Sequence, residues 1–374
     1  MIFTGHKTYI DITISITWIL HFLYLDPMLK PFVVTLGLCV LGMCLILDLY
    51  GADVKITLAP SLRAVDATGQ ELQRPNFIHP VEGEWELNRT ALSELRSRLK
   101  PLETAQNFVL SQDSLATKRR LPLMFGKKPY YVKDKDKDST PEISPFINRT
   151  LGVCSLVGNS GILTGSKCGQ KIDSGDFVIR FNMPPVCSPY LDDIGRRTDL
   201  VTTSRGRMNS KWGLLKSRTG QEKFLHHLHD QYGEDTFVVS APFTIRRDIE
   251  VLLSISELLQ SSNSSVVPLY ISPIHVRQTL QAWRDLGLNL KGRINFSSGF
   301  YYTSVALELC DQVNIYGFWP FRTDREGRPV RYHYYKSVDN GGLSNSWHAM
   351  DKEFEKLLQL HNLGVLQLIN GNCR

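Results

Sequence analysis

The sequence predicts an α/β fold in which a mostly parallel sheet is flanked by helices on both faces. Two observations support this fold class: after Leu151 short β-branched runs alternate with amphipathic stretches, and the alternation repeats along the chain. The expected strands are Val153–Val157, Phe177–Arg180, Leu200–Thr203, Phe237–Ser240, Val266–Ile271 and Val313–Tyr316, and the expected helices include Arg247–Gln260 and Ile274–Leu286. Such sheets bind ligands beyond the carboxyl ends of their strands, so the loops after the strands are where chemistry is expected.

The N-terminal region is expected to anchor the protein in a membrane. Residues 31–50 contain the uncharged run Pro31–Leu47, which lies at the short limit of a membrane-spanning helix. A buried core helix and a cleaved signal peptide are the alternatives, although no small-x-small cleavage site follows the run. Residues 1–30 form an N-terminal tail, in which Tyr9–Leu25 is a weaker candidate for a second span because it carries an aspartate and a histidine.

Residues 51–140 are expected to form a stem that leads into the main folded domain, residues 141–374. The stem has scattered prolines and the run Lys133–Asp138, in which lysine and aspartate alternate. Alternating charges of this kind are typical of a solvated surface, so the run is expected to be a solvated loop.

Composition and cysteine placement indicate an oxidising lumenal environment. The chain of 374 residues is 42% hydrophobic and has a net charge of +6, which suits an anionic ligand or a membrane surface but is too weak to indicate nucleic acid. Five cysteines follow the apolar span, at positions Cys154, Cys168, Cys187, Cys310 and Cys373. The same region holds four N-glycosylation sequons, at Asn88, Asn148, Asn263 and Asn295.

Two loops have the residue types of a nucleotide- or anion-binding site. Gly158–Gly161 directly follows an expected strand, and its glycines allow a tight turn and close approach of the backbone to a ligand. A plain turn is the alternative. The second loop, Asn295–Gly299, precedes the helical run Phe300–Asp311, so its N–H groups would lie at a helix N-terminus that favours an anion. Plain N-capping by a serine is the alternative there.

Three further motifs lie nearer the C-terminus. Tyr316–Phe321 (YGFWPF) ends an expected strand and is either core or a platform for a base or sugar. Tyr332–Tyr335 (YHYY) follows it. His348, with Glu353 five residues later, is expected to open an amphipathic helix, whose N-terminus would keep the imidazole neutral and able to accept a proton.

Together these motifs resemble those of the animal sialyltransferases, and of the α2,8-sialyltransferases in particular. Cys154–Asn182 is similar to the large sialylmotif of that family, Ser297–Phe321 to the small one, Tyr332–Tyr335 to the third, and His348 with Glu353 to the very small one. Order and spacing also agree over roughly residues 151–374. The resemblance implies a GT-A-like variant of the Rossmann fold and a catalytic domain at 141–374.

The same resemblance implies a reaction and its substrates. Sialic acid would move from CMP-sialic acid to a terminal sialic acid on a glycoprotein or ganglioside glycan, forming an α2,8 linkage with inversion, with no metal and no other cofactor. The protein would reside in the Golgi membrane as a single-pass type II protein with a lumenal catalytic domain. Association as a homodimer is left open.

The resemblance also assigns roles to individual residues. The residues expected to bind the donor are Asn159, Asn182, Ser297, Ser298, Gly299, Trp319, Tyr332 and His333. His333 would also stabilise negative charge on the departing CMP, and His348 would be the general base that deprotonates the acceptor hydroxyl. The disulfides of the family would correspond to Cys154–Cys310 and Cys168–Cys373, which leaves Cys187 free.

The chain departs from the family pattern at three positions. Phe181 stands where the large motif usually has a cysteine, and Ser298 replaces a common threonine. Asn295 places a sequon almost inside the donor loop, where a glycan would crowd the site.

Two other functions are compatible with parts of the sequence. A metal-dependent glycosyltransferase would use a DxD motif, which Asp134 and Asp136 match, although they do not follow an apolar strand. A lectin-like protein without turnover is the non-enzymatic alternative, against which the histidine pair argues. The acceptor class and the number of sialic acids added are left open. Polysialylating relatives use a basic tract before the large motif. The basic residues at the corresponding place in this chain are interpreted as a solvated face: Lys118, Arg119, Arg120, Lys127 and Lys128.

Overall fold

The computed structural model describes residues 85–117, 120–290, 295–335 and 348–373, together with two short strands, β1 (Ile10–Ile14) and β2 (Val54–Leu58). The chain divides into two compact units, residues 1–73 and 74–374. In the first unit β1 and β2 pair in parallel. The expected membrane-spanning residues 31–50 lie outside the described residues. Among the residues that are described, no helix is long and apolar enough to cross a membrane.

The second unit is built on a seven-stranded sheet, counted over its described residues, with the strand order β11-β10-β5-β6-β7-β8-β9 and every neighbouring pair parallel. The strands are β5 (Val153–Val157), β6 (Phe177–Arg180), β7 (Leu200–Thr203), β8 (Phe237–Ser240), β9 (Val267–Tyr270), β10 (Gln312–Tyr316) and β11 (Gln367–Ile369). The six strands expected from the sequence are therefore present, and the α/β prediction is confirmed. The short edge strand β11 was not anticipated.

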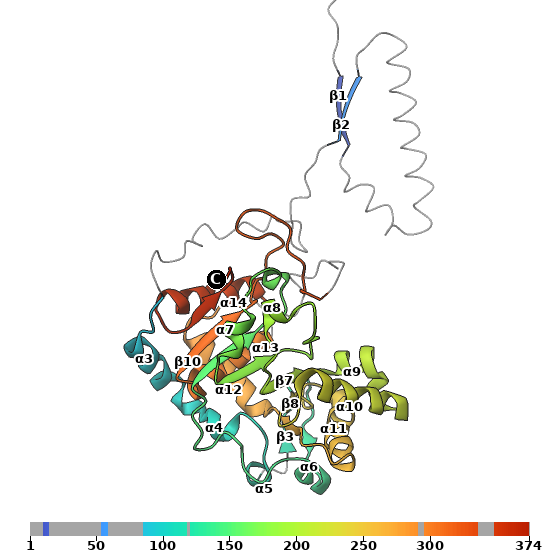
Figure 1. The fold of residues 1–374 in the computed structure, drawn as a ribbon. Helices are drawn as coiled ribbons and strands as arrows, with labels where there is room; N and C mark the ends of the chain where they lie inside the picture. Colours follow the sequence, from blue (N-terminus) through green and yellow to red (C-terminus); the bar gives the residue numbers. More distant parts are fainter. Residues whose placement is uncertain are drawn as a thin grey trace, which may run out of the picture. The chain divides into compact units, whose positions relative to one another are not determined.

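Helices cover both faces of this sheet (Figure 1). The main helices are α3 (Arg89–Leu99), α7 (Gly169–Asp173), α9 (Arg205–Trp212), α10 (Arg218–Tyr232), α11 (Ile249–Ser261), α12 (Pro273–Asp285), α13 (Ser298–Leu309) and α14 (Met350–Asn362). Successive strand residues point to opposite faces. Leu200 packs in the cluster that holds residues of α3, α12, α13 and α14, whereas Val201 packs with residues of α9, α10 and α11.

The folded unit begins earlier in the chain than the expected boundary at residue 141. Leu92 and Leu99 of α3, together with Phe108 and Phe146, belong to the same buried cluster as the central strands. Residues 85–117 of the expected stem therefore contribute side chains to the core that covers one face of the sheet.

The charged run Lys133–Asp138 is also different from the solvated loop that was expected. Residues Asp134–Asp138 form the short helix α6, and Asp136 is only 2% exposed. Its carboxylate accepts hydrogen bonds from the Tyr130 hydroxyl at 2.8 Å and the Lys133 N–H at 2.7 Å. These local partners satisfy one carboxylate oxygen, so this residue of the run can turn inward.

Both expected disulfides are present. Cys154 of β5 is bonded to Cys310 at the end of α13, and Cys168 before α7 is bonded to Cys373 after β11, while Cys187 is free. The two bonds therefore attach the central strand to α13 and the C-terminal segment to the loop after β5.

Candidate active site

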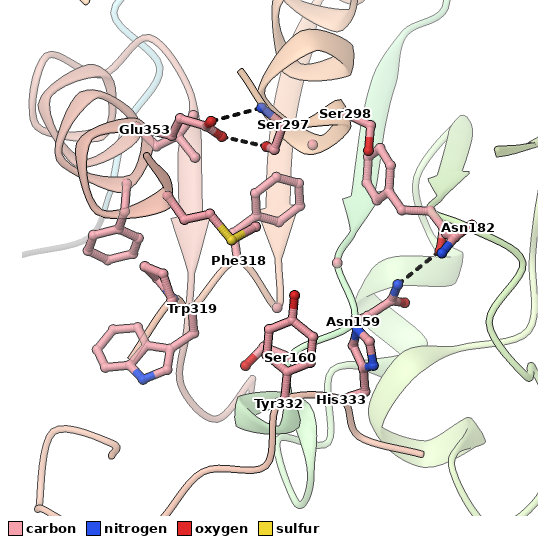
Figure 2. A pocket seen from close by; sticks show the side chains of 18 residues that line it. Asn159, Ser160, Asn182, Ser297, Ser298, Phe318, Trp319, Tyr332, His333 and Glu353 are labelled. Atoms are coloured by element: carbon pink, nitrogen blue, oxygen red, sulfur yellow. Dashed lines mark hydrogen bonds between the residues drawn. The ribbon is translucent and has the colours of Figure 1, made fainter. Parts of the chain in front are cut away.

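The order of the strands along the sheet reverses between β5 and β10. From β5 the strands β6 to β9 follow on one side, and β10 and β11 lie on the other. In open parallel sheets this reversal leaves a crevice at the carboxyl ends of the two strands, which is the usual ligand site. A cavity of about 230 Å³ lies there (Figure 2).

Six segments that are separate in sequence form the cavity wall. Its lining residues are Gly158, Asn159, Ser160, Phe181, Asn182, Ser297, Ser298, Gly299, Gly317, Phe318, Trp319, Pro320, Tyr332, His333, Met350, Glu353, Phe354 and Leu357. All eight residues expected to bind the donor are in this set. His348 is not, although Met350 and Glu353, which follow it closely, are.

The floor of the cavity is formed by two strand-end turns in close backbone contact. Gly158 N–H donates to the Tyr316 carbonyl at 2.7 Å, and a Cβ on Gly158 would lie 2.5 Å from the Gly317 oxygen. Gly317 has φ +69°, in the left-handed region that favours glycine. Gly158 is therefore required by this contact and Gly317 by its backbone conformation, which supports more than a plain turn at residues 158–161.

The neighbouring Asn159 lies between the β5 and β6 loops. Its side-chain Nδ2 donates to the Phe181 backbone carbonyl at 2.9 Å, and its backbone carbonyl accepts from the Tyr334 N–H at 2.9 Å. The Asn159 Oδ1 atom is buried and has no hydrogen-bond partner among the described residues. A ligand N–H group would satisfy this oxygen.

The start of α13 is held by a buried carboxylate. Ser297 caps the helix by accepting from Phe300 N–H at 3.2 Å. Its own N–H donates to Glu353 Oε1 at 2.8 Å, and its hydroxyl donates to Glu353 Oε2. Glu353 is 3% exposed, and burial raises its pKa to about 7, against the lowering effect of the two bonds from Ser297. Figure 2 shows this pair at one end of the cavity.

Sequence reasoning treated Glu353 as a motif partner of His348 and assigned it no role. The His-to-Glu spacing was the available signal. Only the fold shows that the carboxylate of Glu353 reaches Ser297, which lies 56 residues away in the chain.

His348 lies just before α14, which begins at Met350 and not at the histidine. Its Nδ1 is 3.5 Å from the Asn295 carbonyl oxygen. Its pKa is lowered, chiefly by burial, while the Asn295 carbonyl has the opposite effect. The neutral imidazole expected from the helix terminus is therefore favoured here for a different reason, namely desolvation.

Aromatic contacts fix the third motif. The His333 and Tyr335 rings are stacked, with centroids 5.0 Å apart and planes 9° apart, and the Tyr332 ring lies 4.4 Å from that of His333.

Trp319 is 7% exposed, and its ring packs edge-on against Phe354 at 5.5 Å. Trp319 therefore belongs both to a small hydrophobic cluster and to the cavity wall.

The four sequons differ in exposure. Asn88, Asn148 and Asn263 are exposed. Asn295 is 9% exposed, and its Oδ1 accepts from the Phe296 N–H at 3.0 Å. This burial disfavours a glycan at Asn295, and it depends on chain segments far from the sequon. Whether Asn295 carries a glycan stays a question for experiment.

The DxD candidate is not part of the cavity. Asp136 is engaged with Tyr130 and Lys133 in α6, and neither Asp134 nor Asp136 lines the cavity at the switch point. Within the described ranges, no three His, Cys, Asp or Glu side chains are grouped as a metal site would require.

Comparison with known proteins identifies relatives over most of the chain. The family profile described as "Glycosyltransferase family 29 (sialyltransferase)" matches residues 102–365. Alpha-2,8-sialyltransferase 8F of Homo sapiens is 33% identical over 291 residues, which cover 77% of this chain and 71% of that protein. Alpha-N-acetylneuraminide alpha-2,8-sialyltransferase of Xenopus tropicalis is 32% identical over 294 residues, covering 78% of this chain and 81% of that protein.

A solved structure agrees in fold. The crystal structure of a mammalian sialyltransferase superposes with a TM-score of 0.51 at 20% identity, and the match covers 79% of this chain and 100% of that one.

Proposed function

The chain belongs to glycosyltransferase family 29, the sialyltransferases, and we propose that it transfers sialic acid from CMP-sialic acid to a terminal sialic acid of a glycan, forming an α2,8 linkage. The names of its relatives support the linkage. The observation that carries the proposal for the site is the convergence of all eight expected donor-binding residues on one cavity at the switch point of the sheet.

On the donor side, the proposal places CMP-sialic acid between the strand-end turns and the start of α13. The N–H groups at the N-terminus of α13 favour an anion. The orphan Asn159 oxygen suits an amino group such as that of cytosine. Tyr332 and His333 would face the phosphate, and a GT-A-like variant of the Rossmann fold would present all of these groups at the carboxyl ends of the strands.

On the acceptor side, His348 would act as general base. With its proton on Nδ1, which faces the Asn295 carbonyl, Nε2 carries the lone pair that accepts a proton. The acceptor hydroxyl oxygen would form a bond to the anomeric carbon as the bond from that carbon to the phosphate oxygen breaks. The proton moves to His348, the electron pair leaves with CMP, and the anomeric centre is inverted.

The proposal includes turnover without a metal ion. Its support is the family resemblance and the engagement of Asp136 in α6, away from the cavity. Transfer in excess EDTA at an undiminished rate is the expected result, and loss of transfer that manganese restores would contradict it.

We further propose a Golgi membrane location with a lumenal catalytic domain. The two disulfides and the three exposed sequons support an oxidising lumen. Protease protection of the C-terminal domain in sealed microsomes is the test, and digestion without detergent would contradict the orientation.

The central test uses full-length protein with CMP-sialic acid and a panel of glycans, read by mass spectrometry and linkage analysis. The panel contains asialo and sialylated versions of an N-glycan, an O-glycan and a ganglioside. Addition of sialic acid only to sialylated acceptors, in α2,8 linkage, is expected. Transfer to asialo acceptors alone would retain the family but reject the proposed linkage.

A further inference from the structure

Helix α9 carries an arginine that contacts one lining residue of the cavity, Asn182, and the ring neighbour of another, His333. Arg207 Nε donates to the Asn182 carbonyl at 2.7 Å. Its Nη2 donates to the Tyr335 hydroxyl at 3.0 Å, and its guanidinium lies 5.8 Å from the centroid of that ring. Arg207 does not itself line the cavity, and it belongs to none of the motifs singled out in the sequence.

The first contact supports a strained turn. Asn182 has φ +60° and the next residue, Met183, has φ +50°, so two successive residues occupy the left-handed region. Such backbone costs free energy and persists only where neighbours hold it in place. Besides Arg207, Thr202 Oγ1 accepts from Asn182 N–H at 2.8 Å, and the Ser204 hydroxyl donates to Asn182 Oδ1 at 2.9 Å.

These supports come from a single segment. Thr202 lies near the end of β7, and Ser204 caps α9 by accepting from the Arg207 N–H at 3.2 Å. The position of Asn182 is therefore set by the β7–α9 connection, with Arg207 as its only charged support among the described residues.

The second contact links Arg207 to another lining residue, His333, through an aromatic ring. Tyr335 stacks on His333, whose ring is part of the cavity wall. Arg207 and Tyr335 are 128 residues apart in the chain. The guanidinium thus connects Asn182 on the β6 loop with His333 in the third motif.

We propose that Arg207 is a positioning residue for the donor: it sets the separation of the Asn182 and His333 walls of the cavity. The inference rests on the proposed function, because it takes CMP-sialic acid as the ligand between these walls. A planar guanidinium can direct two N–H groups at two fixed acceptors, whereas a lysine ammonium on a flexible stem cannot hold the same fork. Charge at this position is therefore not sufficient.

The test is Arg207→Lys in the full-length protein, with Arg205→Lys as the matched control. Arg205 is on the same helix, lies 3.6 Å from Asp248, and does not line the cavity. Because charge-assisted hydrogen bonds are lost, R207K is expected to raise the Kd for CMP, measured by calorimetry, and the KM for CMP-sialic acid about tenfold. The acceptor KM should stay within about twofold, and R205K should leave all three constants within about twofold of wild type.

A second variant, Tyr335→Phe, keeps the ring stacked on His333 but removes the hydroxyl that Arg207 holds. We expect about a threefold rise in the donor KM, and no further rise when Y335F is added to R207K, because both changes break one connection. If R207K does not fold, Y335F alone carries the prediction.

The outcomes separate the inference from the proposed function. Wild-type protein that binds no CMP would reject the proposed function and this inference with it. If the wild-type protein binds CMP, three results would overturn the positioning role alone. These are unchanged donor constants in R207K, a change confined to the acceptor KM, and multiplicative effects of R207K and Y335F in the double variant. A lower Tm with unchanged constants in the folded fraction would show a purely structural role and would also overturn it.

Discussion

The donor side of the cavity and the segment that carries His348 are built in different ways. On the donor side, the turns after β5 and β10 are in contact through their backbones. Helix α13 is capped by Ser297, which also donates two hydrogen bonds to Glu353. His348 instead precedes its helix, with Nδ1 3.5 Å from the Asn295 carbonyl. The shape of the donor cavity is therefore set by backbone contacts, whereas the action of the proposed base depends on one side chain and its burial.

The largest expected effect comes from His348→Ala. Since His348 does not line the donor cavity, CMP binding should stay within about twofold, while kcat should fall by roughly 10²-fold or more for want of a proton acceptor. Calorimetry with CMP and steady-state kinetics are the measurements. His333→Ala is the contrast, and it should weaken both CMP binding and turnover. A folded H348A protein with near wild-type kcat would remove the general-base assignment.

Gly158→Ala should affect the donor side of the cavity, where the turns after β5 and β10 are in contact. Its Cβ would lie 2.5 Å from the Gly317 oxygen and 2.9 Å from the Phe318 ring, so the two turns must separate. We expect a stability loss of about 1–3 kcal/mol, read from urea unfolding, and weaker CMP binding. Gly206→Ala is the control, because the nearest atom to its Cβ would be 3.8 Å away and alanine suits a helix. Unaltered CMP affinity in G158A would refute the backbone argument.

Glu353→Gln examines the link between the two sides, because Glu353 on α14 holds Ser297 on α13. The pKa of Glu353 is raised from 4.5 to about 7, so the unfolded chain ionises first as pH rises and the native state loses stability between about pH 4.5 and 7. The glutamine avoids a buried charge. Relative to wild type, E353Q should therefore gain on the order of 2–3 kcal/mol between pH 5 and pH 8, measured by unfolding at each pH.

Glu355→Gln on the same helix serves as the control for removal of an acid. Glu355 pairs with Lys352 at 2.6 Å on the surface side of α14, and pairs of this kind contribute little, so its replacement should change the free energy of unfolding by less than about 1 kcal/mol. A stability difference between E353Q and wild type that is the same at every pH would show that Glu353 does not titrate in this range.

The smallest effect is expected at Asn295, which joins the two sides. Its carbonyl faces His348 and it lies two residues before Ser297. Because the side chain is buried, Asn295→Gln should cause no loss of glycan mass, whereas Asn88→Gln, Asn148→Gln and Asn263→Gln should each remove one glycan in gel-shift analysis. A glycan found on Asn295 of active protein would require the donor loop to take another conformation.

The sequence alone predicted the sheet more accurately than the beginning of the folded unit. Val153–Val157 and Phe177–Arg180 match the observed strands, because continuous apolar β-branched runs bounded by turn residues are typical of buried parallel strands. The pattern around Leu92 and Phe108 predicts a stem, because a short amphipathic helix at the edge of a core resembles a solvated one in its periodicity.

The sequence identifies the candidate site through local motifs, and their eight expected donor residues line one cavity because most of these motifs lie at a strand end or a helix start. The roles of these residues stay predictions. Arg207 was missed because nothing in the run RGRMNSK distinguishes it from the other basic residues there. The burial of Asp136, Asn295 and Glu353 could not be read from the sequence either, since their types are usually exposed.

The sequence by itself thus determined six of the seven described strands of the sheet and the loops that follow them, because these depend on side-chain pattern over a few residues. The tertiary structure decided which of these loops meet. Arg207 reaches Tyr335, and Glu353 reaches Ser297, across 128 and 56 residues of chain. Hydrogen bonds and burial at such separations depend on how the helices pack on the sheet, and that packing sets the charge state of Glu353 and His348.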